Sequence, residues 1–259
     1  MKKLSLLIAT LLTVMTLSPL NIMVINAKAV GSTGIISLEQ NIIKTEQHVL
    51  PILMYHSISD HPIGLEYLSV RSCDFNSQMK YLMENNYTPL DLNQIHLARY
   101  YKKPIIITFD DGYRDNYLVA YSILKEYGFK ATIMLIVNNI NRSGYMSQAQ
   151  IKKMSDLISF QCHTASHCDL YKTPEKDYYK EYITSKSNLE AIAGKPVYAL
   201  SYPFGRYNDS LIRLLSEHYQ VALCSNPGFY NEKDGPYKLR RITIRREDTL
   251  EDFINKIEP

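Results

Sequence analysis

Short apolar runs alternate with amphipathic stretches along most of this chain of 259 residues. The apolar runs are rich in Ile, Leu and Val and are bounded by Gly, Pro or polar residues, which predicts strands buried on both faces. These runs span residues 49–55, 105–109, 131–137, 158–162, 197–202, 221–225 and 239–244. Between them, apolar residues recur every three or four positions, which predicts helices with one buried stripe. These helices span residues 74–85, 117–127, 147–157, 174–192, 208–218 and 250–257.

The alternation of strands and helices predicts parallel βα units. About seven such units follow one another with no Gly/Ser- or Pro-rich linker between them. We therefore predict an α/β fold consisting of a single distorted (β/α) barrel of about seven parallel strands. The corresponding domain spans residues 49–259, a length that suits one barrel with its own core.

The N-terminal segment has the pattern of an export signal. Lys2 and Lys3 precede an apolar run, and small residues around Ala27 fit a signal-peptidase site, so residues 1–29 are expected to be a signal peptide. An uncleaved membrane anchor is the alternative, because residues 4–25 are nearly long enough to span a bilayer. Residues 30–48 are polar and mixed and are expected to be a linker. Either reading predicts a protein that is secreted or held at the extracellular face of the membrane or cell wall.

The charge of the chain comes from this leader. The formal net charge is +3, and the leader contributes three of the 29 basic residues and none of the 26 acidic ones. The remaining chain is electrically balanced, which gives no support for binding to nucleic acid or to an anionic membrane surface. We expect a monomer.

The four cysteines are too few and too scattered for a disulfide scaffold. Cys162 and Cys168 bracket two histidines. Two partly buried thiols are the favoured interpretation, while a disulfide, which an oxidising compartment would permit, or a zinc–thiolate site stays open.

Several predicted strands end in reactive residues. His56 follows the first strand, Asp110 and Asp111 follow the second, and His163 follows residues 158–162. In a parallel barrel these ends converge on one mouth. Adjacent carboxylates repel each other and call for a cation, a shared proton or solvent, although an Asp-Asp-Gly turn that merely ends a strand is the simpler interpretation.

His163 and His167 lie four residues apart. On a helical turn this spacing places both imidazoles on one face, with the Cβ atoms about 5–6 Å apart, close enough to share a metal ion. Two imidazoles and one carboxylate make an open zinc-type site that keeps a position for water. Surface or capping histidines would explain the pair alone, but not its combination with the Asp-Asp strand end.

The order of three motifs resembles the polysaccharide deacetylases of carbohydrate esterase family 4, which share the NodB-homology domain. The motifs are residues 107–113 (ITFDDGY), 163–167 (HTASH) and 202–205 (YPFG). The resemblance covers most of the chain from about Val49. It implies a metal-dependent hydrolase that removes acetyl groups from N-acetylglucosamine units of an extracellular or cell-wall polysaccharide. An O-acetyl xylan-type esterase and a non-catalytic glycan-binding module on the same fold are the alternatives.

The resemblance also implies roles for individual residues. Asp111, His163 and His167 would bind a divalent metal ion, usually Zn²⁺, with Co²⁺, Ni²⁺ and Mn²⁺ as further candidates. Asp110 would be the general base. The backbone N–H of Phe204, the aromatic residue after the proline, would bind the oxyanion.

The general acid is expected near the start of the chain. Many relatives use a histidine in a late Leu-x-His motif, but here no histidine follows His218. Residues 51–56 (PILMYH) resemble the rearranged branch of the family that acts on poly-N-acetylglucosamine, which implies that His56 is the acid.

Two further departures from the family pattern concern the base and the substrate. Ser201 stands where many relatives have an arginine that orients the base; Arg240 or Arg241 could replace it, although a solvated charge pair is the favoured interpretation. The chain has no tryptophan, so stacking on sugar rings is expected from tyrosines, with Tyr113 and Tyr202 nearest to the motifs.

Overall fold

The computed structural model describes residues 50–62, 64–169 and 172–258. The predicted leader and linker lie outside the described residues. Within those residues, no helix combines the length and the apolar character needed to cross a bilayer.

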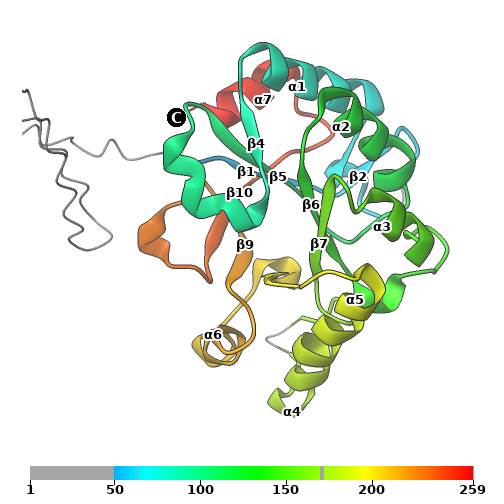
Figure 1. The fold of residues 1–259 in the computed structure, drawn as a ribbon, viewed down its shortest axis with the longest axis vertical. Coiled ribbons are helices and arrows are strands. Elements are labelled where there is room, and N and C mark those ends of the chain that lie inside the picture. Colours follow the sequence, from blue (N-terminus) through cyan, green and yellow to red (C-terminus); the bar gives the residue numbers. More distant parts are fainter. Residues whose placement is uncertain (1–49, 63, 170–171, 259) are drawn as a thin grey trace, which may run out of the picture. The chain divides into compact units, whose positions relative to one another are not determined.

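Seven parallel strands close into a barrel (Figure 1). They are β1 (Ile52–Tyr55), β5 (Pro104–Phe109), β6 (Ala131–Leu135), β7 (Ile158–Cys162), β8 (Ala199–Ser201), β9 (Val221–Pro227) and β10 (Leu239–Thr243). The ring closes because β1 pairs in parallel with β10 on one side and with β5 on the other. This confirms the predicted barrel and its strand number.

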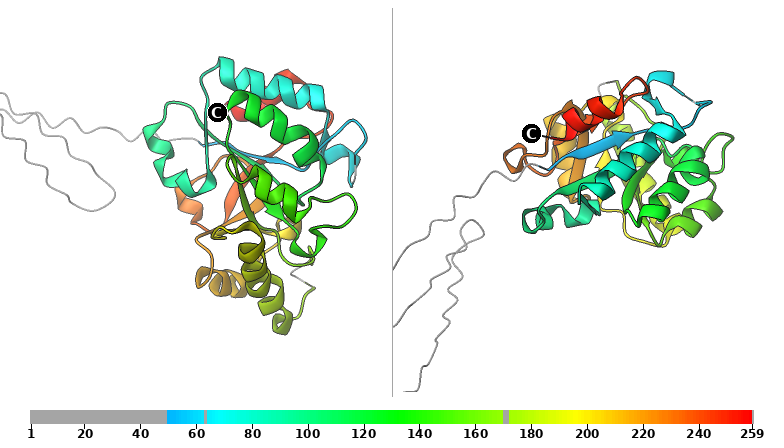
Figure 2. Two further views of the ribbon diagram at one scale, coloured as in Figure 1. Left: turned by 45° about the vertical axis from the view of Figure 1, so that its right-hand side comes forward. Right: turned by 90° about the horizontal axis from the view of Figure 1, so that it is seen from above.

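Helices surround the barrel (Figure 2). They are α1 (Ser72–Glu84), α2 (Tyr121–Tyr127), α3 (Gln148–Met154), α4 (Glu175–Tyr178), α5 (Ser185–Ala193), α6 (Asp209–Ser216) and α7 (Leu250–Ile257). Side chains cap the first turns of α3 and α6: Ser147 forms a capping box with Gln150, and Asn208 accepts a hydrogen bond from the N–H of Leu211. The helix starts predicted at Ser147 and Asn208 are therefore confirmed.

The hydrophobic pattern missed the shortest elements. Strand β4 (Thr88–Leu90) pairs with the first half of β5, and a 3₁₀ helix spans Leu92–Tyr100. Strands β2 (Ser57–Ile58) and β3 (Ser69–Val70) pair with each other beyond the end of β1. Segments of two or three residues show no period, and the proline inside β4 argues against a strand.

The long helix predicted at residues 174–192 is interrupted. Between α4 and α5 the chain forms a π-helical stretch, Tyr179–Thr184. Tyr182, Ser185 and Leu189 recur every three or four positions and are buried, so the buried stripe predicted for this segment is confirmed although the helix is not a continuous α-helix.

Alternate residues of each strand point into the barrel, as the two-residue period of a strand requires. The deeper interior is apolar and includes Ile52, Ile106, Ala199 and Leu239, which belong to one buried cluster. One strand step further on, the interior becomes polar and contains Thr108, Ser201 and Arg241, all fully buried. Beyond this polar layer the strands reach their carboxyl ends, where the predicted reactive residues lie.

Candidate active site and metal centre

Strand β5 places Asp110 at the mouth of the barrel. The N–H of Asp110 donates to the carbonyl of Tyr55 at 2.9 Å, which continues the pairing of β5 with β1. Below it, the Thr108 hydroxyl donates to the carbonyl of Leu53 at 2.6 Å. The Asp110 side chain is only 4% exposed, so its carboxylate depends on protein partners rather than water.

Arg241 supplies those partners from β10, which lies on the other side of β1 from β5. Its Nη1 and Nη2 donate to the two carboxylate oxygens of Asp110 at 2.8 and 2.7 Å, and its Nε donates to the carbonyl of Cys224 at 3.0 Å. The Ser201 hydroxyl accepts from Nη2 at 2.8 Å and donates to Asp110 at 3.2 Å. Burial raises the pKa of Asp110, but the charge and hydrogen bonds of Arg241 outweigh it and hold the pKa well below its usual range.

The expectation of a solvated charge pair is therefore wrong for Arg241, which has no exposed surface. Arg240 has that role instead, because its exposed guanidinium pairs with Asp234 at 2.8 Å. The two neighbours differ because consecutive residues of β10 point to opposite faces.

A sharp turn directs Asp111 away from the strand. Asp111 and Gly112 both have left-handed backbones, with φ of 72° and 78°. A Cβ at Gly112 would overlap the Leu135 side chain, so the turn requires glycine for its conformation and for space. The turn brings Asp111 next to the two motif histidines.

The three residues predicted to bind a metal ion lie together. Oδ1 of Asp111 is 3.6 Å from Nε2 of His163 and 3.6 Å from Nε2 of His167, and one ligand atom from each residue lies within 4.8 Å of the other two. Nδ1 of His163 is 2.8 Å from the carbonyl of Ser201 and therefore carries the proton, which leaves the Nε2 lone pair free to face Asp111. Burial, together with the nearby His163, lowers the pKa of His167 and favours the neutral ring that binds metals. The residues present fit a divalent cation.

The histidine pair does not lie on a helical turn, so that expectation is wrong. Residues 163–167 form a loop in which Thr164 and His167 have left-handed backbones, with φ of 67° and 59°. The Thr164 hydroxyl accepts from the N–H of His167 at 2.9 Å and closes the loop. The imidazole centroids are 4.8 Å apart, so the loop achieves the proximity that a helix was expected to give.

His56 follows β1, as predicted, and its backbone is held by Asn116. The amide of Asn116 donates to the carbonyl of His56 at 2.8 Å and to the Asp115 carboxylate at 3.1 Å. Asp115 also accepts from the Ser57 hydroxyl at 2.7 Å and from the N–H of Ile58 at 3.1 Å. Asp115 and Asn116 carry no distinctive signal in the sequence, because two polar residues at a helix start normally indicate a cap.

The His56 ring is largely enclosed. Its Nδ1 is buried and has no hydrogen-bond partner within the described part of the chain. Burial lowers the pKa of His56, and the neighbouring carboxylates of Asp110 and Asp111 act in the opposite direction. The structure therefore brings together His56 and the four residues of the Asp-Asp and histidine motifs.

The three expected substrate-binding residues differ in accessibility. Phe204 is 60% exposed, has a left-handed backbone with φ of 57°, and places its ring 4.7 Å from that of His167. Tyr113 is 9% exposed and stacks on Tyr145. Burial and the hydrogen-bonded Asp111 carboxylate raise the pKa of Tyr113, so its hydroxyl stays protonated.

Tyr202 cannot stack on a sugar, which corrects that expectation. It is 1% exposed, and its hydroxyl donates to the carbonyl of Tyr237 at 3.1 Å. Tyr202 follows the inward-pointing Ser201, so its side chain points outward, toward the helices.

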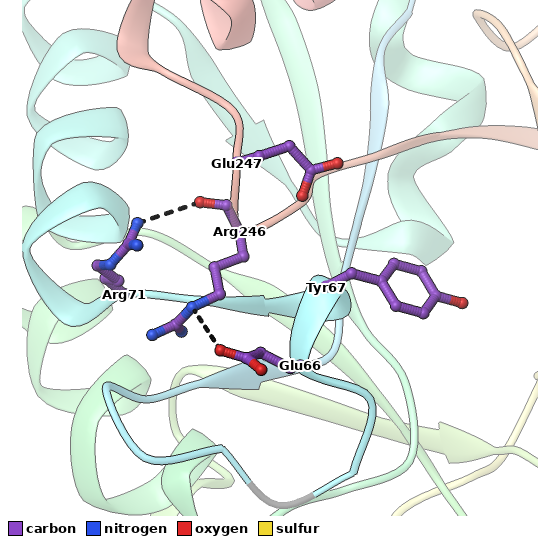
Figure 3. Close-up of a pocket in the computed structure, with 5 residues that line it drawn as sticks. All are labelled: Glu66, Tyr67, Arg71, Arg246 and Glu247. Atoms are coloured by element: carbon purple, nitrogen blue, oxygen red, sulfur yellow. Dashed lines mark hydrogen bonds and ion pairs between the residues drawn. The ribbon is translucent and has the colours of Figure 1, made fainter.

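A separate pocket of about 500 Å³ lies beside the segment that follows His56. Figure 3 shows Arg246 between Arg71 and Glu66, with Tyr67 and Glu247 completing the lining. Arg246 donates to the carbonyls of Ser59 and Ser69 at 3.2 and 3.3 Å. The Arg246 guanidinium thus stabilises the paired strands β2 and β3. None of the predicted site residues lines this pocket.

All four cysteines are free thiols. Cys162 is buried, with its sulfur 3.4 Å from the Ser185 hydroxyl, and Cys168 is partly buried. This agrees with the favoured interpretation of two thiols.

Comparisons with known proteins identify the family. Residues 98–221 match the family model of the polysaccharide deacetylases. YxkH of Bacillus subtilis, a protein named for the same family, is 36% identical over 210 residues, which cover 78% of this chain and 74% of that protein. The chain belongs to the polysaccharide deacetylase family. As a member of this family it is a deacetylase, a hydrolase.

Two further similar proteins are named as deacetylases. The poly-β-1,6-N-acetyl-D-glucosamine N-deacetylase of Staphylococcus aureus is 26% identical over 210 residues, covering 73% of this chain and 71% of that protein. A solved structure of a Streptococcus pyogenes deacetylase in complex with acetate has a TM-score of 0.76 and 29% sequence identity, and the match covers 82% of this chain and 99% of that one.

Proposed function

We propose that this polysaccharide deacetylase is a metal-dependent N-deacetylase. Its substrate would be N-acetylglucosamine units of an extracellular or cell-wall polysaccharide. The observation that carries the proposal is the convergence of Asp111, His163 and His167 beside a second, buried carboxylate, Asp110. Support for the substrate class comes from the Staphylococcus aureus relative, whose name specifies an N-acetylglucosamine polymer.

Asp111, His163 and His167 would hold the metal ion, with Zn²⁺ the first candidate and Co²⁺, Ni²⁺ and Mn²⁺ the others. Bound there, the ion would polarise the acetyl carbonyl and lower the pKa of a water molecule. Asp110 is separate from the three ligands; its Oδ2 is 3.9 Å from Nε2 of His163. Because Arg241 keeps it ionised and fixes its orientation, Asp110 can accept the proton of the attacking water.

His56 would act as the general acid. Burial outweighs the nearby carboxylates and lowers the pKa of His56, so its ring would have to take up a proton before it acts. That proton would pass to the leaving amine nitrogen as the C–N bond breaks. The exposed Phe204 and the hydroxyl of Tyr113 lie at the same mouth, where the backbone N–H of Phe204 would bind the oxyanion and the two side chains would contact the sugar.

The test measures acetate released by the full chain loaded with Zn²⁺ or Co²⁺. Substrates are β-1,6- and β-1,4-linked N-acetylglucosamine oligomers and O-acetylated xylan, and Asp110→Asn is assayed in parallel. We expect acetate from an N-acetylglucosamine oligomer, and a variant that binds metal but has lost activity by several orders of magnitude. Acetate from xylan alone would establish the O-acetyl esterase instead. Metal binding without acetate from any glycan would point to the glycan-binding module.

A further inference from the structure

A buried glutamate outside the predicted motifs contacts the loop that carries both histidines. Glu181 lies in the π-helical stretch Tyr179–Thr184 and is 8% exposed. A π-helical turn contains one residue more than an α-helical turn and is found often at functional sites. Here it lies between α4 and α5, against residues 163–167.

Glu181 makes three hydrogen bonds to the centre of this loop. Its Oε2 accepts from the N–H of Ser166 at 2.9 Å, and its Oε1 accepts from the Ser166 hydroxyl at 2.9 Å. Its main-chain carbonyl accepts from the N–H of Ala165 at 3.0 Å. Ala165 and Ser166 lie between the two histidines, so the contacts act on the segment that determines their separation.

The loop needs external support because its conformation is strained. Left-handed backbones at non-glycine residues cost about 1–3 kcal/mol each and persist only where the surroundings enforce them. Thr164 and His167 both have this conformation. On the other side of the loop, the N–H groups of Val137 and Asn138 donate to the carbonyls of Thr164 and Ala165, at 3.1 and 2.9 Å.

The two sides support different parts of the loop. The contacts from residues 137–138 reach no further than Ala165, whereas Glu181 holds Ser166, the residue directly before His167. The position of His163 is already fixed by β7 and by its bond to the carbonyl of Ser201. His167, by contrast, does not directly follow a strand, so the position of its imidazole depends on the conformation of the loop.

We propose that Glu181 is a positioning residue for the metal site. By holding Ser166, it places the imidazole of His167 where Nε2 faces Asp111. The hydrogen bonds, rather than the negative charge, carry this effect. The inference rests on the proposed role of Asp111, His163 and His167 as metal ligands.

The test is the affinity of the metal-free full chain for Zn²⁺ and Co²⁺, measured by competition with a chromophoric chelator. Glu181→Ala removes both side-chain bonds, and we expect the affinity to fall about 10–100-fold, as for other groups that orient metal ligands. Glu181→Gln can accept from the Ser166 N–H and donate to its hydroxyl, so we expect an affinity close to that of the wild type. The visible spectrum of bound Co²⁺ should change in the alanine variant only.

Glu190→Gln is the matched control. Glu190, on α5, also accepts a backbone N–H from a distant segment, that of Val197 at 3.0 Å. We expect its metal affinity to equal that of the wild type. If Glu181→Ala fails to fold, Ser166→Ala, which removes one of the two side-chain bonds, should still weaken binding severalfold.

Two outcomes would overturn the inference. An unchanged metal affinity in Glu181→Ala, with only the apo melting temperature reduced, would make Glu181 a structural residue. A glutamine variant as weak as the alanine variant would assign the effect to charge. A wild-type chain that binds metal but releases no acetate would refute the proposed activity while leaving this inference standing.

Discussion

The two halves of the candidate site are built in different ways. Asp110 directly follows β5 and Arg241 lies on β10; neither has a left-handed backbone, and they form a bidentate ion pair inside the barrel. His167 lies on a loop with a left-handed backbone and is held in place from a neighbouring helix. The proposed base, Asp110, thus depends on compensation of a buried charge, whereas the proposed metal ligand His167 depends on loop geometry. Mutations in the two halves should therefore affect different properties: stability and catalysis in the first, metal affinity in the second.

The largest effect is expected from Arg241→Met. The change leaves the Asp110 carboxylate buried without its partner, and breaking such a pair costs about 3–5 kcal/mol. Urea unfolding of the metal-free protein should show this loss, and deacetylation should be abolished. Arg240→Met is the control, because its exposed pair with Asp234 contributes at most about 1 kcal/mol. Equal losses in the two variants would contradict the buried charge compensation.

Asn116→Ala should impair catalysis without affecting the metal. The variant loses the bond from the Asn116 amide to the His56 carbonyl, and a misplaced acid can reduce kcat up to about 100-fold. Steady-state kinetics would show a lower kcat, and chelator competition an unchanged metal affinity. A parallel loss of metal affinity would mean that Asn116 supports the whole mouth rather than His56.

Thr164→Val should act on the metal half alone. Valine keeps the shape of threonine but leaves the N–H of His167 without its acceptor, at a cost of about 1–3 kcal/mol. We expect metal affinity to fall about tenfold, while kcat at saturating metal changes little. A loss of kcat with intact metal binding would show that the loop also contributes to the reaction.

The smallest effect concerns acid stability. The folded pKa of Asp110 is depressed, so its ionised form stabilises the protein above the unfolded pKa of about 4, and this contribution is lost as pH falls toward the folded value. Between pH 5 and pH 3, the metal-free wild type should therefore lose more stability than Asp110→Asn, by up to about 1.4 kcal/mol per pH unit. Parallel curves for the two proteins in urea would contradict the depressed pKa.

The sequence predicted the parts of the fold that have strong periods. The seven barrel strands and the helix starts at Ser147 and Asn208 follow from apolar runs and capping residues. Strand β4 is too short for a period and contains Pro89. The π-helical stretch has no sequence signal, because the spacing of its buried residues also fits a continuous α-helix. Glu181 was missed for that reason.

Within the site, the motifs predicted which residues gather but not how they are held. The choice between Arg240 and Arg241 depends on which face of β10 points inward, and the burial of Leu239 in the barrel interior settles it, since Arg241 shares its face. The same alternation along β8 separates Ser201 from Tyr202. A strand period applied to those two segments could have corrected both expectations. The loop at residues 163–167 could not be predicted, because left-handed threonine and histidine backbones run against local preference.

The closure of the barrel between β1 and β5 makes the order of strands along the chain irrelevant to the chemistry. A ring has neither a beginning nor an end, and β1 lies between β5 on one side and β10 on the other. His56, at the end of β1, therefore neighbours Asp110 whether the gene encodes that strand first or last. A circularly permuted gene could move this strand from one end of the chain to the other and still leave the proposed acid and the proposed base at the ends of adjacent, hydrogen-bonded strands.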